Sequence, residues 1–246
     1  MIIIENISKS YGRHKVIDDI SLSINSGSVF GFLGPNGSGK TTTMKMLVGL
    51  TRSDTGSIEI NGRKPQEIQT RENIGFMPEE SSFYDRLTGL EFLKFSDQLF
   101  AKQNVIVEKQ YDELLRQVGI YQARNRIIRT YSKGMKQRLG FAQAVVNDPG
   151  YIFLDEPLEG LDPIGRREMK EVIRQMRQKQ KTIFFNSHIL TDIEDLCDSI
   201  GIICAGRILY KGSVEEFCKG KPLEEKFIST VEEYNQQHHD NEKIYN

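Results

Sequence analysis

The sequence contains no tryptophan and only three cysteines among its 246 residues. Cys197, Cys204 and Cys218 are odd in number, show no C-x-x-C spacing and have no neighbouring histidine pair. They therefore indicate neither a disulfide framework nor a zinc site, and they fit a reducing compartment. A chain of this length can build a large hydrophobic core without cross-links, as one large domain or as a core with an inserted subdomain.

The sequence also has almost no net charge and no long apolar run. Lys and Arg number 33 against 34 Asp and Glu, which leaves a net charge of −1. Such a balance argues against strong attraction to nucleic acid or anionic lipid, and we expect no nucleic-acid partner. The richest apolar run, Val29 to Leu33, is far shorter than the roughly 18 residues of a membrane span. The beginning of the chain resembles a first strand rather than a signal peptide.

The hydrophobic pattern changes along the chain. The first 60 residues show short strand-like segments with alternating apolar positions, which predicts a β-rich N-terminal unit. Residues 88–118 have apolar positions at helical spacing, and beyond Pro149 strands alternate with helices. Near-continuous apolar strands between helices are typical of a parallel sheet that is covered on both faces. We therefore expect an α/β fold with an antiparallel N-terminal subdomain, a helical subdomain inserted at about 81–146, and a polar, flexible tail over 231–246.

A glycine-rich string follows the apolar strand that ends at Leu33. It fits the pattern G-x-x-x-x-G-K-[ST] and is followed by a helix-compatible segment; its residues are Gly34, Pro35, Asn36, Gly37, Ser38, Gly39, Lys40 and Thr41. Main-chain amides in such a loop, with the start of the helix, can hold phosphate oxygens. Lys40 would neutralise the β- and γ-phosphates, Thr41 would offer a hydroxyl to Mg²⁺, and Thr42 would add a further donor. The pattern predicts a nucleoside triphosphate site.

Polar residues end two later apolar strands. Asp155 and Glu156 follow Tyr151–Leu154, and His188 follows the strand that begins near Thr182. Because parallel strands end at the same edge of a sheet, we expect these side chains to face the phosphates. Asp155 would hold Mg²⁺, Glu156 would polarise the attacking water, and His188 would contact the γ-phosphate. The alternative for Asp155 and Glu156 is a solvated pair at a surface turn, and for His188 a structural histidine.

The segment Tyr131-Ser132-Lys133-Gly134-Met135-Lys136-Gln137-Arg138 lies about twenty residues before the acidic strand. Together with the phosphate loop and the acidic strand, it resembles the signature of the ATP-binding subunits of ABC transporters, and the resemblance covers about residues 2–219. The resemblance implies a P-loop NTPase core, a single ATPase domain over residues 1–230, and the cofactors ATP and Mg²⁺. It also implies that the chain is an ATPase.

The resemblance further implies a head-to-tail dimer with a second such ATPase subunit. Ser132, Lys133, Gly134 and Met135 would face the nucleotide bound by the partner chain, and Asp162 would cross the interface. Tyr11 matches the aromatic residue that stacks on adenine. Whether the two subunits are identical is left open.

The sequence departs from the family pattern in two places. Tyr131, Lys133 and Met135 replace the usual Leu, Gly and Gln of the signature. Glu79 stands where the family usually has a glutamine that touches Mg²⁺ and reports ATP to the membrane subunit. A carboxylate can still bind Mg²⁺, so the expected metal residues are Thr41, Asp155 and Glu79, but it adds negative charge near the triphosphate.

The family resemblance implies a separate polytopic membrane subunit and a peripheral position on the cytoplasmic face of the membrane. The expected docking groove lies at Glu79–Asp85, with Phe83, Tyr84, Phe92 and Phe95 nearby; Phe92 and Phe95 could equally belong to the core. Both departures resemble the branch that contains drug and antibiotic export systems, so export is expected, of a solute that the sequence does not name. The alternative is an ATPase of the same type that acts as a regulatory module or on nucleic acid or ribosomes.

Overall fold

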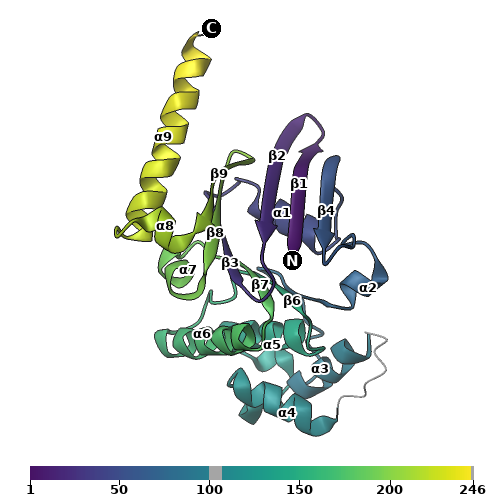
Figure 1. The fold of residues 1–246 in the computed structure, drawn as a ribbon. Helices are drawn as coiled ribbons and strands as arrows, with labels where there is room; N and C mark the ends of the chain where they lie inside the picture. Colours follow the sequence, from purple (N-terminus) through teal and green to yellow (C-terminus); the bar gives the residue numbers. More distant parts are fainter. Residues whose placement is uncertain (100–106, 245–246) are drawn as a thin grey trace.

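The computed structural model describes residues 1–99 and 107–244. Two β-sheets lie at the centre, and helices surround the larger of them (Figure 1). The smaller sheet is antiparallel and consists of β1 (Ile2–Tyr11), β2 (His14–Ile24) and β4 (Thr55–Ile60), in the order β2-β1-β4. Ile2 pairs with Ile24 and Ile4 with Leu22, and all four side chains are buried. The alternating pattern therefore gives the sheet one apolar face, and the predicted antiparallel β unit is confirmed.

The larger sheet has six strands in the order β5-β6-β7-β3-β8-β9. Their bounds are β3 (Val29–Leu33), β5 (Ile74–Met77), β6 (Tyr151–Asp155), β7 (Thr182–Asn186), β8 (Ser199–Cys204) and β9 (Arg207–Ser213). The first five strands in this order are parallel, and β9 runs antiparallel to β8. Every residue of β3, β6 and β7 is buried, which is why these strands are mostly apolar, with polar residues such as Asp155 and Asn186 at the ends of β6 and β7. Their carboxyl ends meet at one edge, where a ligand crevice is expected.

Three α-helices lie in the described chain between β5 and β6. They are α3 (Gly89–Gln98), α4 (Glu108–Gln117) and α5 (Lys133–Val145), with short 3₁₀ helices at Tyr121–Ala123 and Ile128–Thr130. Thr88 begins α3 with a capping box, because Glu91 N donates to Thr88 Oγ1 and Thr88 N donates to Glu91 Oε2. In Figure 1, α3 and α4 lie at the bottom of the view, away from β1 and β2. The helices thus extend from one end of the parallel sheet.

The remaining helices are α1 (Lys40–Leu47), α2 (Ile68–Arg71), α6 (Pro163–Gln178), α7 (Leu190–Leu196), α8 (Val214–Cys218) and α9 (Leu223–Ile244). The sequence predicts a polar, flexible tail over 231–246, and in the structure α9 continues through this stretch to Ile244. The helix projects away from the sheets in Figure 1. Leu223 is buried at its start, so the first turn is fixed by packing, and the following Glu, Gln and Lys residues are good helix formers. Residues 245–246 lie outside the described part.

The core has two parts, one on each face of the parallel sheet. One part joins the sheet to β1, β2, β4 and α1, and the other joins it to α4, α5, α6 and α7. At the centre of the first part, the ring of Phe184 lies 5.3 Å from that of Phe32 and 5.9 Å from that of Phe153. These rings come from three neighbouring strands, so they fix the order β6-β7-β3 by side-chain packing as well as by hydrogen bonds.

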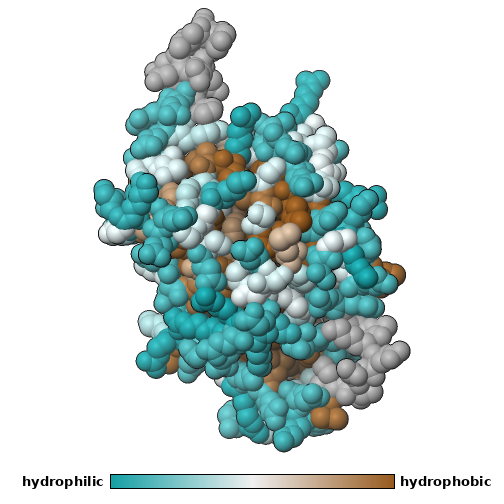
Figure 2. Space-filling view, viewed as in Figure 1, coloured by the Kyte–Doolittle hydropathy of each residue, from teal (hydrophilic) through white to brown (hydrophobic). Residues whose placement is uncertain are grey.

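Polar side chains cover most of the face seen in Figure 2, and apolar side chains are visible between β9 and β2. Cys197, Cys204 and Cys218 are all free thiols, which agrees with the absence of a predicted disulfide framework. Within residues 1–99 and 107–244, no helix combines the length and the hydrophobicity that a membrane span requires.

Candidate nucleotide-binding site

The glycine-rich string forms the loop between β3 and α1. Gly37 and Gly39 have φ angles of 77° and 110°, in the region that side chains rarely adopt. Gly39 is the N-cap residue immediately before α1, and a Cβ there would lie 2.5 Å from Ile17 Cδ1. Glycine is therefore required at this point by both backbone angle and space. The loop turns sharply so that the first amides of α1 open toward the pocket described below.

Lys40 is the first residue of α1 and bends back over the loop. Its Nζ donates to the carbonyl oxygens of Gly34, at 2.7 Å, and Pro35, at 3.0 Å. Burial lowers the pKa of Lys40, while the carboxylates of Glu156, Asp155 and Glu79 act in the opposite direction. The ammonium group is thus placed among main-chain oxygens and acidic side chains, next to where the motif predicts phosphates.

The acidic strand ends in two buried carboxyl groups. Asp155 and Glu156 are 2% and 7% exposed, and burial raises the pKa of both. Asp155 lies in register with Asn186, whose Nδ2 donates to Asp155 Oδ1 at 2.5 Å. His188, two residues beyond β7, donates from Nδ1 to Glu156 Oε2 at 2.8 Å. The parallel register of β6 and β7 therefore brings the predicted acidic and histidine residues together, as the sequence analysis expects.

These residues line one pocket of about 630 Å³. It contains the predicted residues Asn36, Gly37, Gly39, Lys40, Thr41, Thr42, Glu79, Asp155, Glu156 and His188. Three further residues line it that the sequence analysis did not select, namely Val16, Glu159 and Asn186. Asn186 could have been found from the sequence, because it ends the strand that leads to His188. Val16 and Glu159 carry no such signal and reach the pocket through tertiary packing.

The donor set of the pocket fits a hard cation bound together with phosphates. Thr41, Asp155 and Glu79 offer oxygen atoms, which Mg²⁺ prefers. Asn186 Oδ1 is buried in the same wall, and no residue of the described part donates a hydrogen bond to it. In the described part of the chain, no group of three or more His, Cys, Asp or Glu side chains could hold a metal by itself. A cation here would therefore need oxygen atoms from Thr41 and from the nucleotide.

Other predicted residues lie outside the lining of this pocket. Ser38 is buried in the phosphate loop, and its Oγ has no hydrogen-bond partner among the described residues. Tyr11 lies at the end of β1 and is 52% exposed, with Lys9 Nζ 5.6 Å from its ring centre. Asp162 begins α6, where its Oδ1 accepts from Gly165 N at 2.7 Å. An exposed Tyr11 could stack on a base, but the pocket itself does not include it.

The signature segment does not line the pocket of its own chain, although Lys133 pairs with Glu159 in the pocket wall. Ser132 begins α5, and its Oγ accepts from Met135 N at 3.2 Å. Lys133 lines a separate groove of about 480 Å³ together with Glu79, Glu80, Ser81, Phe83, Tyr131, Lys136 and Gln137. Ser132, Lys133, Gly134 and Met135 are absent from the described residues that line the nucleotide pocket. Within one chain, the signature and the phosphate loop therefore do not form a common site.

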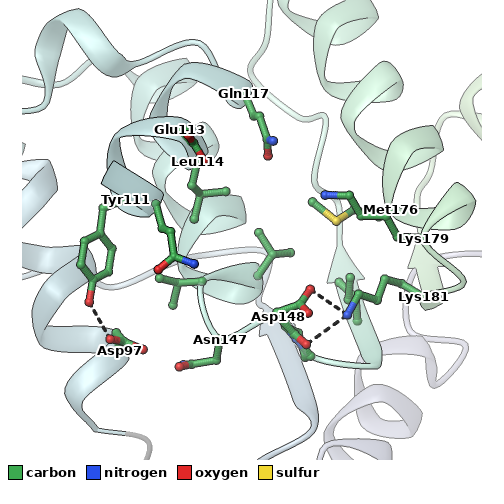
Figure 3. Close-up of a pocket in the computed structure, with 15 residues that line it drawn as sticks. Asp97, Tyr111, Glu113, Leu114, Gln117, Asn147, Asp148, Met176, Lys179 and Lys181 are labelled. Atoms are coloured by element: carbon green, nitrogen blue, oxygen red, sulfur yellow. Dashed lines mark hydrogen bonds and ion pairs between the residues drawn. The ribbon is translucent and has the colours of Figure 1, made fainter. Parts of the chain in front are cut away.

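A second pocket, of about 470 Å³, lies between the inserted helices and the core (Figure 3). Tyr111 Oη donates to Asp97 Oδ2 at 2.6 Å on one side, and Lys181 Nζ pairs with Asp148 Oδ1 at 2.7 Å on the other. Burial and the Asp97 carboxylate raise the pKa of Tyr111. None of the predicted nucleotide residues lines this pocket. It marks the junction of two structural units rather than the phosphate site.

The fold and the phosphate loop define a P-loop nucleotide-binding protein. Comparison with known proteins then identifies its family. The family model described as "ABC transporter" matches residues 17–159. The chain belongs to this family, so the predicted family is confirmed.

Three known proteins illustrate the relationship. An uncharacterized ABC transporter ATP-binding protein of Synechocystis is 44% identical over 80% of this chain and 56% of its own length. The lantibiotic transport ATP-binding protein SrtF of Streptococcus pyogenes is 37% identical over 94% of this chain and 97% of its own. A solved ATP-binding subunit of an ABC transporter has a TM-score of 0.85 at 27% identity, covering 94% of this chain and 99% of that one. The chain thus spans little more than half the length of the Synechocystis relative and nearly all of SrtF.

Proposed function

We propose that this chain is the ATP-binding and ATP-hydrolysing subunit of an ABC transporter and that it drives solute movement through a separate membrane subunit. The observation that carries the proposal is that Lys40, Glu156 and His188 line one pocket at the end of the phosphate loop. A triphosphate in this pocket would meet a cation, a buried carboxylate and an imidazole. These are the groups that hydrolysis of a terminal phosphate requires.

Each of the three groups has a distinct part in hydrolysis. Glu156 orients and polarises the attacking water, because its carboxylate is held in place by His188 at 2.8 Å. Lys40 and the amides at the start of α1 stabilise the charge that spreads over the γ-phosphate oxygens. His188 holds the Glu156 carboxylate on one side and offers its exposed ring to the phosphate on the other. The chain thus supplies position and charge, which are the main sources of catalysis in phosphoryl transfer.

Mg²⁺ would be held by Thr41, Asp155 and Glu79. When bound, the ion would neutralise negative charge on the phosphates. The buried Asn186 amide fixes Asp155, because its Nδ2 donates to Asp155 Oδ1. Glu79 adds a carboxylate where the family pattern has a neutral amide, so the pocket carries one more negative charge than that pattern would give it.

We further propose that two such subunits pair head to tail. The support is that no signature residue lines the pocket of its own chain, so Ser132 and Gly134 need a second molecule to meet a nucleotide. Ser132 and the first amides of α5 form an end that can receive an anion. In this arrangement Asp162 lies at the interface, and Lys133 and Met135 face the partner's nucleotide. Tyr11, exposed at the end of β1, stacks on the adenine.

The groove beside the signature is the proposed docking surface for the membrane subunit. Tyr84 is 60% exposed and stacks edge-on against Phe95, with ring centres 5.2 Å apart. Phe92, in contrast, is buried and packs against Phe83. Of Phe92 and Phe95, which could both belong to the core, Phe92 is therefore the core residue. Tyr84 directly follows Phe83, which lines the groove, so Tyr84 and Phe95 form an exposed aromatic pair next to it. Docking there would place the chain peripherally on the cytoplasmic face of a membrane.

We propose export as the direction of transport. The support is the relationship to SrtF, whose name describes lantibiotic transport and whose length the chain nearly matches. The unusual Glu79 and the variant signature at Lys133 and Met135 point to the same branch.

The test is a tagged purification from detergent-solubilised membranes of the native cell, with mass spectrometry of the proteins that co-purify. We expect a polytopic membrane protein at comparable stoichiometry. Tyr84→Ala should reduce its recovery, whereas the matched control Ile68→Ala, an exposed apolar residue on α2, should not. Recovery of ribosomal proteins or DNA without a membrane protein would overturn the transport proposal.

A further inference from the structure

The main chain of Glu156 has an unusual conformation. Its φ angle is 50°, in the left-handed region that residues with side chains adopt only when their surroundings impose it. This conformation turns the chain sharply between β6 and the loop that leads to α6. It also determines the direction in which the Glu156 carboxylate leaves the backbone. Whatever holds the main chain here therefore helps to aim the carboxylate.

Hydrogen bonds from β7, from α5 and from within the loop itself hold the Glu156 peptide groups. Glu156 N donates to the Asn186 carbonyl of β7 at 2.9 Å. The carbonyl oxygen of Glu156 accepts from Glu159 N at 3.1 Å within its own loop, and from Gln137 Nε2 at 2.7 Å. Gln137 is the contact that comes from a helix outside the loop, and its side chain is buried, with 9% exposed. Because buried polar groups need a hydrogen-bond partner, the Gln137 amide is held in this contact with the Glu156 carbonyl.

The same helix contacts the loop a second time. Lys133, at the start of α5, reaches Glu159 Oε1 with its Nζ at 2.5 Å. Its aliphatic chain lies over Gly160, where a Cβ would come within 2.8 Å of Lys133 Cδ and Cε. Gly160 has a φ angle of 70°. The first half of α5 thus holds the loop 156–160 at both ends, through a buried hydrogen bond and an exposed ion pair.

We propose that Gln137 is a positioning residue for ATP hydrolysis, which holds the main chain of Glu156 so that its carboxylate faces the terminal phosphate. Gln137 lies five residues after Ser132 on the same helix. Any shift of the start of α5, where the partner's nucleotide would bind, therefore moves the contact that aims Glu156. This part of the inference rests on the proposed function, since it assumes hydrolysis at Glu156 and the head-to-tail pair.

The test is Gln137→Met, which keeps the length of the side chain and removes its hydrogen-bond donor. We expect kcat to fall by about 10- to 100-fold, because misplacement of a reacting group by about 1 Å has an effect of this size. The KM for ATP and the affinity for ATP should stay within about threefold of wild type, because Gln137 does not line the nucleotide pocket. The matched control is Gln143→Met on the same helix, which should leave kcat unchanged.

A double-mutant cycle distinguishes a positioning role from a merely structural one. In a Glu156→Gln background, Gln137→Met should cause little further loss of the residual turnover, because the contact acts through the Glu156 carboxylate. An equal fractional loss in both backgrounds would overturn the proposal. So would wild-type kcat in Gln137→Met while Glu156→Gln alone abolishes turnover. If Glu156→Gln itself retains turnover, the proposed hydrolytic role of Glu156 fails instead, so the two failures are distinguishable.

Discussion

His188 Nδ1 donates a hydrogen bond of 2.8 Å to Glu156 Oε2, and this contact joins the ends of β7 and β6 inside the nucleotide pocket. The His188 side chain is 58% exposed, whereas that of Glu156 is 8% exposed. The exposed imidazole therefore stands in front of a buried carboxylate. This arrangement separates two tasks, because one group can contact a nucleotide while the other is shielded from bulk water.

Replacement of Glu156 by glutamine tests its role directly. Glu156→Gln preserves the size of the side chain but removes the carboxylate that polarises water. We expect ATP binding to be retained and turnover to fall by about 100-fold or more, the contribution usual for general base catalysis. With hydrolysis blocked, ATP should trap a dimer that size-exclusion chromatography detects. Phosphate release within a few-fold of wild type would contradict the assignment, and exposed Glu171→Gln on α6 is the matched control.

The pH dependence of turnover should report the contact between Glu156 and His188. Burial raises the pKa of Glu156, and the contact with His188 lowers it. Because Glu156 acts as a carboxylate, turnover is lost as the pH falls through this pKa. His188→Ala removes the lowering contact, so the pKa should rise further and the acid limb of the kcat profile should move to higher pH. An acid limb that stays in place or moves to lower pH would show that the contact does not control Glu156.

Much of the site could be predicted from the sequence, because its signals are local. The phosphate loop is one continuous string, and Asp155, Glu156 and His188 lie at the end of an apolar strand or within two residues after it. Because parallel strands end at the same edge of a sheet, these segments can then be expected to meet in one site. Gln137 could not be found in this way. Its contact with Glu156 depends on how α5 packs against the sheet, and a glutamine within a helix gives no sign of the carbonyl that it will meet.

The fold shows the same division between local and tertiary signals. Alternating isoleucines predict β1 and β2, and continuous apolar runs predict β3, β6 and β7. Burial on one face requires apolar residues at alternate positions, and burial on both faces requires them at nearly every position. The sequence of helix α9 carries a weaker signal for its structure. Its later turns are polar, and the sequence analysis therefore expected a flexible tail, but Leu223 anchors the first turn and the helix continues from there.

Glu79 should weaken nucleotide binding in the absence of Mg²⁺. Its carboxylate lines the pocket with Asp155 and Glu156, and its charge adds to the effect of burial, which raises the pKa of Asp155. Glu79→Gln removes one negative charge, so we expect the affinity for ATP in EDTA to rise by roughly threefold to tenfold. The gain should shrink in high salt, which screens charge interactions. Titration with a fluorescent ATP analogue measures both effects, and an affinity that is unchanged or lower in Glu79→Gln would contradict them.

Asp192 should make a large contribution to stability. It is buried, with 2% exposed, and it pairs with Arg166 and, at 2.9 Å, with Lys170. These pairs join the first turn of α7, just after His188, to the first turns of α6, just after Asp162. Asp192→Asn leaves the two cations without their buried partner. We expect the free energy of unfolding to fall by about 3–5 kcal/mol, the usual result of breaking a buried ion pair from one side.

The matched control for Asp192→Asn is Asp195→Asn in the same helix. Asp195 pairs with Lys170 at 3.0 Å and with Arg174 at 2.8 Å, but its side chain is 44% exposed. An exposed ion pair contributes about 0–1 kcal/mol, because water and salt screen it. Both substitutions remove one negative charge that faces α6, so the difference between them in urea unfolding isolates the effect of burial. Equal unfolding midpoints would show that the buried pair adds no more than the exposed one, and that α6 and α7 are joined by apolar packing instead.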